Sequence, residues 1–274
     1  MDQLAPLLNQ ISLSARVFFS GDMCQVVNFD GSELAGHVHL MKSGKVALTV
    51  REKEVGTIER PSVLFFPRPC QHSLVPVDDK GCELLCASVD LGVRVRSPLA
   101  MALPEVLILP MDDMTPIAPT LELLFREAFN DEFGRQAALD RIAEYFLIQM
   151  LRHVMTTGQL QSGIFAALGD SRLAHAVKAM HEKPSHPWTL DALADLCGMS
   201  RARFAVNFRD ATGITPLDYL TDWRISVAQN LIKQGRSIKS VAAAVGYQSN
   251  AALTRVFLKR VGTSPSGWGK QSAY

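Results

Sequence analysis

Three histidines in the first third of the chain have the residue type and spacing that a ligand or metal site needs. His37 and His39 lie one residue apart in GHVHLMKSGKVAL, so on a β-strand both side chains face the same way. His72 ends the later segment PSVLFFPRPCQH. Three imidazoles that a fold brings together can hold a transition metal or line a polar pocket. These histidines form the first candidate site, provided that strands position them.

A second group of reactive side chains consists of five cysteines. Their spacings match neither a zinc knuckle nor an even disulfide framework. Cys82 and Cys86 lie four residues apart, which on an extended strand puts both on one face about 13 Å apart, too far for a disulfide without bending. We expect buried, unreactive thiols in a reducing cytoplasm, while thiol-based redox sensing stays open. The cysteines are Cys24, Cys70, Cys82, Cys86 and Cys197.

Alternating apolar and polar residues predict that the segment carrying both groups, up to about residue 110, forms β-strands. The run KVALTVR places Val46, Leu48 and Val50 on one face, with the smaller Ala47 and Thr49 between them. Many short strands separated by turns are typical of a sandwich or a small barrel. Further strand-like runs, bounded by Pro, Gly or charged residues, are 63–67, 82–91 and 106–110.

After Pro119 the apolar spacing becomes helical. A helix predicted at about 136–155 is apolar over much of its circumference, so it must be covered on two sides. We expect a partner subunit to cover one side, through residues that include Leu147 and Leu151. A central position within its own domain is the alternative.

The charge of the chain is divided between its two halves. The 274 residues carry a net charge of +1, and a composition of 47% hydrophobic and 20% charged residues is that of a globular protein. Residues 1–170 hold 14 Lys and Arg against 21 Asp and Glu (−7), whereas residues 171–274 hold 14 against 6 (+8). A basic half suggests a polyanionic partner, with chance clustering of charge as the alternative.

Breaker residues in TTGQLQSG predict a linker at 159–170 between a domain of residues 1–158 and a domain of residues 171–274. No apolar run approaches the roughly 20 residues of a membrane helix. The N-terminal MDQLAPLLNQ lacks the basic region of a signal peptide. We therefore expect a cytoplasmic protein.

The basic domain contains two copies of one sequence repeat. Each copy has a capping Ser or Thr before a short helix, a Gly-containing turn, a second cap and helix, and then Gly with Pro three residues later. Two short helices joined by a tight turn form a helix-turn-helix, whose second helix can enter the major groove of DNA. A purely structural all-α domain is the alternative. The matching pairs are Thr189 and Ser237, Gly198 and Gly246, Ser200 and Ser249, Phe208 and Phe257, Gly213 and Gly262, and Pro216 and Pro265.

The run WTLDALADLCGMSRARFAVNFRDATGITPLDYLTDWRISVAQNLI, with SIKSVAAAVGYQSNAALTRVFLKRVGTSPSGW after it, resembles the DNA-binding domain of the AraC/XylS family of bacterial transcription regulators. Arg224 and Ala228 in the connecting helix strengthen this resemblance. It implies two helix-turn-helix units bridged by one helix at about 217–234. The segments around the three histidines are similar to the cupin-like sensory domain of the same family.

Helical geometry selects the side chains that should read DNA. Phe204 and Phe208 define the buried face of the first recognition helix, and Leu253 and Phe257 that of the second. The family commonly has Arg at the position of Val206, so the heads should be unequal, and only the second, through Arg255, should hydrogen-bond to a base. A phosphate contact or a surface ion pair is the alternative for Arg255. The predicted DNA-binding residues are Arg201, Ala202, Arg203, Val206, Arg209, Asn250, Ala251, Thr254, Arg255 and Lys259.

Cupin-like barrels that bind metal use a His-x-His pair, a following Glu and a later His. This sequence lacks the Glu after His39, so we expect no metal and no cofactor. His39, Phe66 and His72 are predicted to line a pocket for a small ligand. Ordinary half-buried strand residues are the alternative.

These observations predict an α+β protein: an N-terminal cupin-like β-barrel followed by helices, and a C-terminal all-α domain with two helix-turn-helix motifs. The resemblance implies a homodimeric, sequence-specific transcription regulator, not an enzyme, that binds promoter DNA, contacts RNA polymerase as an activator and answers to an unknown small-molecule effector. Two rivals remain: a metal-dependent cupin enzyme with a DNA-binding domain, and an architectural DNA-binding protein without a ligand.

Overall fold

The computed structural model describes residues 13–31, 35–78, 81–91, 98–158 and 163–271. The chain divides into two compact units. Among the described residues, the β unit comprises those within 13–91 and 103–157, and the helical unit comprises those within 158–271 together with 98–102. The signal-peptide prediction concerns residues 1–12, which lie outside the described residues.

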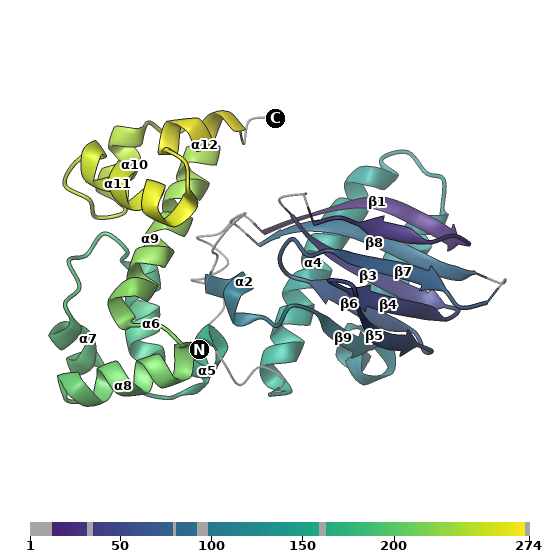
Figure 1. The fold of residues 1–274 in the computed structure, drawn as a ribbon, viewed down its shortest axis with the longest axis horizontal. Helices are drawn as coiled ribbons and strands as arrows, with labels where there is room; N and C mark the ends of the chain where they lie inside the picture. The colour runs from purple at the N-terminus through teal and green to yellow at the C-terminus, as the bar shows by residue number, and fades with distance from the viewer. Residues whose placement is uncertain (1–12, 32–34, 79–80, 92–97, 159–162, 272–274) are drawn as a thin grey trace. The chain divides into compact units, whose positions relative to one another are not determined.

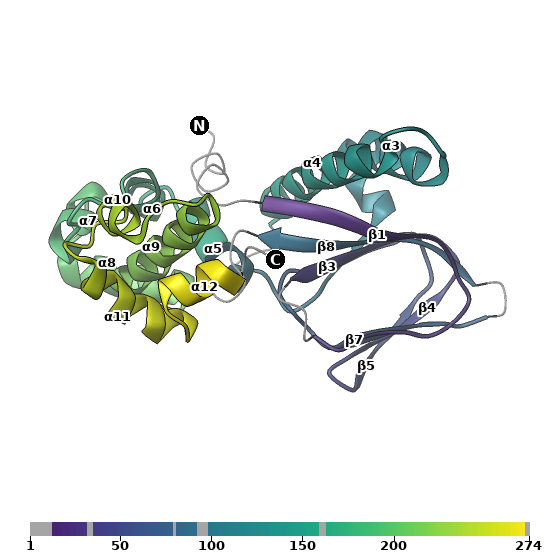
Figure 2. The same cartoon turned by 90° about the horizontal axis from the view of Figure 1, so that it is seen from above.

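The described strands of the β unit form two antiparallel sheets. The five-stranded sheet has the order β1-β8-β3-β6-β9, and the four-stranded sheet has the order β2-β7-β4-β5. Figure 2 shows the two sheets facing each other, with helices α3 and α4 on the outer side of the five-stranded sheet. The strands are β1 (Leu13–Met23), β2 (Val27–Phe29), β3 (Gly36–Ser43), β4 (Val46–Val50), β5 (Lys53–Ile58), β6 (Ser62–Phe66), β7 (His72–Pro76), β8 (Cys82–Leu91) and β9 (Leu107–Pro110). The helices are η1 (Met111–Ile117), α3 (Ala118–Phe129) and α4 (Arg135–Thr156). The predicted β-rich fold is confirmed.

Apolar side chains at alternate positions along the strands fill the space between the two sheets. Val46, Leu48 and Val50 of β4 are buried while Ala47 and Thr49 between them are half-buried, as the sequence predicts. They join one apolar core to which β3, β6, β7 and β8 also contribute. Burial of this surface is the main force that holds the two sheets together.

The prediction that α4 presents Leu147 and Leu151 to a partner subunit is wrong. Both side chains are fully buried within the chain, because α4 packs against β1 and α3. The helix is also tied to β1 by a hydrogen bond from the Val17 backbone N–H to the Asp140 carboxylate, 2.9 Å long. Its wide apolar surface is explained by burial inside its own unit, which was the alternative.

The helical unit is built around one long central helix, α9 (Pro216–Lys233). Figure 1 shows α9 running from the pair α7 and α8 to the pair α10 and α11. Residues 159–162 of the predicted linker lie outside the described residues, and residues 164–169 form the buried helix α5. None of the described helices is long and apolar enough to cross a membrane. The other helices are α2 (Pro98–Ala102), α5 (Ile164–Gly169), α6 (Leu173–Glu182), α7 (Leu190–Leu196), α8 (Arg201–Thr212), α10 (Ile238–Ala244), α11 (Asn250–Val261) and α12 (Pro265–Gln271).

The repeated sequence unit is a repeated structural unit. The predicted caps accept hydrogen bonds from backbone N–H groups in the first turns of their helices; they are Thr189, Ser200, Ser237 and Ser249. Gly213 and Gly262 end α8 and α11 in the left-handed conformation, with φ of 79° and 84°. A residue with a Cβ adopts this conformation only at a cost, which is why glycine ends both helices.

Candidate DNA interface and sensory cluster

The first helix-turn-helix, here called the first head, consists of α7 and α8. Phe204 and Phe208 are fully buried and fix the inner face of α8. The opposite face presents the predicted residues Ala202, Arg203 and Val206 to solvent; Arg201 and Arg209 are also exposed. Side chains on the outer face of such a helix are the ones that reach base edges in the major groove.

The second head consists of α10 and α11 and repeats this arrangement. Leu253 and Phe257 are fully buried, and Ala251, Arg255 and Lys259 face outward. Asn250 is exposed at the first position of α11 and Thr254 is half-buried. Within the described part of the chain Arg255 has no ion-pair partner, so no neighbouring carboxylate neutralises its guanidinium.

The two outer faces differ in chemistry. Val206 is 57% exposed and borders a shallow hollow of about 250 Å³. Leu190, Pro216 and Leu217 also line this hollow, with Arg209 as its only charged member among the described residues. Arg201 lies at the other end of α8, where its Nη1 is 3.4 Å from Asp191 Oδ2. The first head therefore offers an apolar surface where the second head offers Arg255.

Besides the continuous helix α9, the side chain of Arg224 in that helix also connects the two heads. Its Nε donates to the Pro184 carbonyl at 2.7 Å and its Nη2 to the His186 carbonyl at 2.8 Å. Both carbonyls belong to the segment just before the first head. The guanidinium also lies 5.8 Å from the ring centre of Tyr247, in the turn of the second head.

Arg260 fixes the second recognition helix to α9. Its Nη2 lies 2.6 Å from Asp218 Oδ1 and its Nε lies 3.2 Å from Asp222 Oδ1. This network was not predicted from the sequence, although two acidic residues four apart on a helix share one face and are a signal for a common partner. Hydrogen bonds from Thr215 and Arg260 lower the pKa of Asp218, so this carboxylate is charged at neutral pH.

The β unit brings the three histidines together. His37, His39 and His72 are all buried, and the ring centres of His39 and His72 are 5.1 Å apart. His39 Nε2 and His72 Nε2 share a hydrogen bond of 2.9 Å, and His72 Nδ1 lies 2.7 Å from the Cys70 carbonyl oxygen. Phe66 stacks on His72 with ring centres 3.8 Å apart. The three predicted ligand-binding residues, His39, Phe66 and His72, therefore lie in mutual contact.

Phe29 completes this cluster and was missed from the sequence. It stacks on the other side of His72 at 4.4 Å and lies 4.8 Å from His39 and 4.9 Å from His37. Its strand, β2, has only three residues and no alternation that could have drawn attention to it. The two stacked aromatic rings make the surroundings of His72 largely apolar.

Burial sets the protonation of the cluster. It lowers the pKa of His72 to about 4, and it lowers the pKa of His39 well below the ordinary value, with the neighbouring His72 and His37 adding to the effect. Both rings are neutral at pH 7, as a metal ligand or a neutral hydrogen-bonding partner must be. Among the residues that the structure describes, no group of three His, Cys, Asp or Glu side chains is placed to hold a metal ion.

The paired heads on a basic unit, together with a β unit that encloses a histidine cluster, define a DNA-binding regulator with an added sensory domain. Residues 2–156 match a family of cupin domains and residues 193–271 match a family of helix-turn-helix domains. The chain therefore belongs to the AraC-type helix-turn-helix transcription regulators with a cupin domain at the N-terminal side.

The chain is similar to two full-length relatives and, over its helical unit, to one solved DNA-binding domain. An uncharacterized HTH-type transcriptional regulator of Haemophilus influenzae is 29% identical over 293 residues, which cover 98% of this chain and 97% of the relative. The RCS-specific HTH-type transcriptional activator RclR of Escherichia coli is 28% identical over 232 residues, covering 83% and 81%. The crystal structure of the DNA-binding domain of AdpA with a target DNA is 31% identical over 37% of this chain and 93% of that chain, with a TM-score of 0.35.

Proposed function

We propose that this regulator activates transcription by binding promoter DNA through both heads, with the second head supplying the hydrogen-bonded base contact. The observation that carries the proposal is the outward face of α11, where Arg255 stands exposed and without an ion-pair partner among the described residues. Arginine can donate two hydrogen bonds to one guanine, which discriminates between bases. Val206 at the equivalent position of the first head offers apolar contact, for example to a thymine methyl group.

The remaining predicted DNA-binding residues have supporting roles in this proposal. Arg203, Arg209 and Lys259 provide positive charge for phosphates, and Ala202 and Ala251 allow close approach to the groove. Arg201, Asn250 and Thr254 lie near the N-terminal ends of α8 and α11, which are the ends that enter the groove in helix-turn-helix proteins.

The proposal assigns sensing to the other half of the chain. Residues 1–158 form the sensory and dimerisation domain, residues 159–170 the linker and residues 171–274 the DNA-binding domain. A small molecule binds beside His39, Phe66 and His72, and the homodimer contacts RNA polymerase in the cytoplasm. Support comes from the neutral, aromatic-lined histidine cluster, and from a relative that is named as an activator.

The metal-dependent cupin enzyme and the architectural DNA-binding protein, the two alternatives to this proposal, predict different observations. In our proposal the chain is not an enzyme, so a purified protein with stoichiometric iron, nickel or manganese would favour the metal-dependent alternative. An architectural protein would occupy very many unrelated genomic sites. A promoter-reporter assay with the bound sites cloned upstream tests the proposal directly: transcription should rise with the intact protein, and this rise should be smaller with Arg255→Ala.

A further inference from the structure

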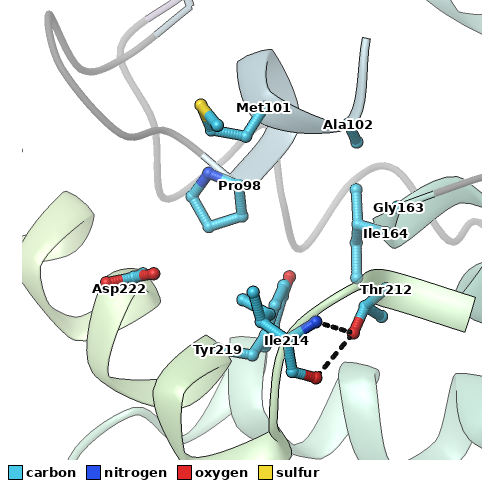
Figure 3. Close-up of a pocket in the computed structure, with 9 residues that line it drawn as sticks. All are labelled: Pro98, Met101, Ala102, Gly163, Ile164, Thr212, Ile214, Tyr219 and Asp222. Carbon is cyan, nitrogen blue, oxygen red and sulfur yellow. Dashed lines mark hydrogen bonds between the residues drawn. The ribbon is translucent and has the colours of Figure 1, made fainter. Parts of the chain in front are cut away.

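A cavity of about 290 Å³ lies within the helical unit, apart from both recognition faces. Helix α2, the start of α5, the end of α8 and the first turns of α9 surround it (Figure 3). Most of its wall is apolar, including Pro98, Met101, Ile164 and Ile214. Its size lies at the lower limit of small-molecule pockets, which begin at about 300 Å³.

Asp222 gives this cavity its electrostatic character. It is the only charged side chain among the described residues that line the cavity, and Figure 3 shows its carboxylate across the cavity from Ile164. Only 14% of the Asp222 side chain is exposed. A carboxylate that is mostly shielded from water attracts a cation and repels an anion more strongly than it would in open water.

Asp222 also takes part in the ion-pair network of the second head. Its Oδ1 lies 3.2 Å from Arg260 Nε, and Arg260 follows Arg255 by five residues on α11. A cation that binds Asp222 from the cavity side competes with Arg260 for the same carboxylate. Binding of a cation in the cavity is therefore expected to weaken the ion pair that connects α9 to the second recognition helix.

Helix α2 forms the wall opposite α9, although in the sequence it lies between two stretches of the β unit. Helix α2 packs within the helical unit, yet the described residues on either side of it in the chain, Leu91 and Leu103, belong to the β unit. A Cβ at Gly163 would lie 2.6 Å from the Ala102 Cβ, so glycine is needed for α2 to approach the start of α5. A ligand in the cavity thus touches both α2 and α9.

We propose that this cavity binds a small amphipathic cation, a protonated amine with an apolar body, and that binding changes the affinity of the second head for DNA. The ammonium group pairs with Asp222 and the apolar body lies against Met101, Ile164 and Ile214. The site is separate from the histidine cluster and goes beyond the proposed function, because DNA binding without ligand does not depend on it.

The test uses the full chain and three probes of one length: hexylammonium, hexanol and hexanoate. Calorimetric titration should show binding of hexylammonium, weaker binding of hexanol and none of hexanoate. Asp222→Asn should weaken hexylammonium binding at least tenfold. Asp218→Asn is the matched control, because Asp218 also pairs with Arg260 but does not line the cavity, and its affinity for hexylammonium should equal that of the wild type.

A cavity-filling variant keeps the test decisive if Asp222→Asn unfolds. Met101 is 56% exposed, so Met101→Trp should fold, occupy the cavity and abolish hexylammonium binding with Asp222 intact. No binding of hexylammonium to the wild type, equal binding to Asp222→Asn, or a preference for hexanoate would overturn the proposed site. Hexylammonium should also shift operator affinity about fivefold or more, as allosteric couplings typically do. Binding without such a shift would overturn the link to Arg260, and operator binding without hexylammonium tests the proposed function separately.

Discussion

Gly246 in the turn of the second head lies directly against Ser185, which precedes the first head. A Cβ on Gly246 would be 2.7 Å from the Ser185 carbonyl oxygen and 2.9 Å from its Cα, closer than real contacts allow. Arg224 holds the same segment through the Pro184 and His186 carbonyls. The two heads are therefore joined by a backbone contact and an arginine as well as by α9, which fixes the spacing of their recognition helices.

Gly246→Ala should disturb this spacing. Its φ of +83° already disfavours alanine, and the clash with Ser185 forces the second head to move. Gly262→Ala is the matched control, because its φ is +84° but a Cβ there would meet nothing within 4 Å. The left-handed strain of roughly 1–2 kcal/mol is common to both variants. We expect the free energy of unfolding to fall further for Gly246→Ala, and its affinity for the two-part operator to fall at least about tenfold more. Equal losses would show that the contact with Ser185 does not set the spacing.

Arg255→Ala should weaken binding to the cognate operator by about 1–3 kcal/mol and relax the preference at one or two base pairs. Val206→Ala should cost less, because it removes apolar contact and no hydrogen bond. Both variants would be titrated against single-base operator variants at fixed salt. A uniform loss on every sequence would make Arg255 a phosphate contact, and a larger loss for Val206→Ala would reverse the assignment of the heads.

The buried His181 should make the helical unit sensitive to acid. Its Nε2 lies 2.6 Å from the Tyr219 hydroxyl, and burial lowers its pKa to about 3. In the unfolded chain His181 becomes protonated near pH 6.5, whereas in the folded chain it stays neutral down to about pH 3. The contribution of neutral His181 to the free energy of unfolding is therefore present above pH 6.5 and is lost as the pH falls toward 3. The loss due to His181 between pH 7.5 and 5.5 is about 1.4 kcal/mol. Urea unfolding of His181→Gln should lack this component, and an identical pH dependence in both proteins would refute it.

The cysteines of the β unit should differ widely in reactivity. Burial raises the pKa of Cys82 to about 11 and that of Cys86 to about 12, whereas Cys24 is exposed. Because the thiolate is the reactive form, iodoacetamide should modify Cys24 first and reach Cys82 and Cys86 only on unfolding. Mass spectrometry of partly labelled protein measures the order. Rapid labelling of Cys86 in the folded chain would reopen redox sensing within the barrel.

The sequence predicted local structure best where the backbone itself requires a residue type. Caps such as Ser200 and Ser249, and the left-handed Gly213 and Gly262, mark both heads because few other residues satisfy a helix end. The burial of Phe204 and Phe208 followed from helical periodicity alone.

Contacts between distant segments were not predictable in the same way. The wide apolar surface of α4 was assigned to a partner subunit, because periodicity reports that a face is covered and not what covers it. Phe29 and the pairing of Arg260 with Asp222 depend on the tertiary fold, which no short motif encodes. The cavity beside α2 also requires residues more than 100 positions apart, such as Met101 and Ile214.

Selection of bound sequences from a random DNA duplex library by the full chain is the most direct test of the central claim. We predict one enriched motif with two recognised segments about one helical turn, or roughly 10 base pairs, apart. Affinity for it should fall steeply as salt is raised, because phosphate contacts release counterions. Residues 171–274 alone, with their charge of +8, should bind the same motif. Failure to enrich any motif, or an affinity that does not change with salt, would contradict a two-headed, sequence-specific DNA-binding regulator.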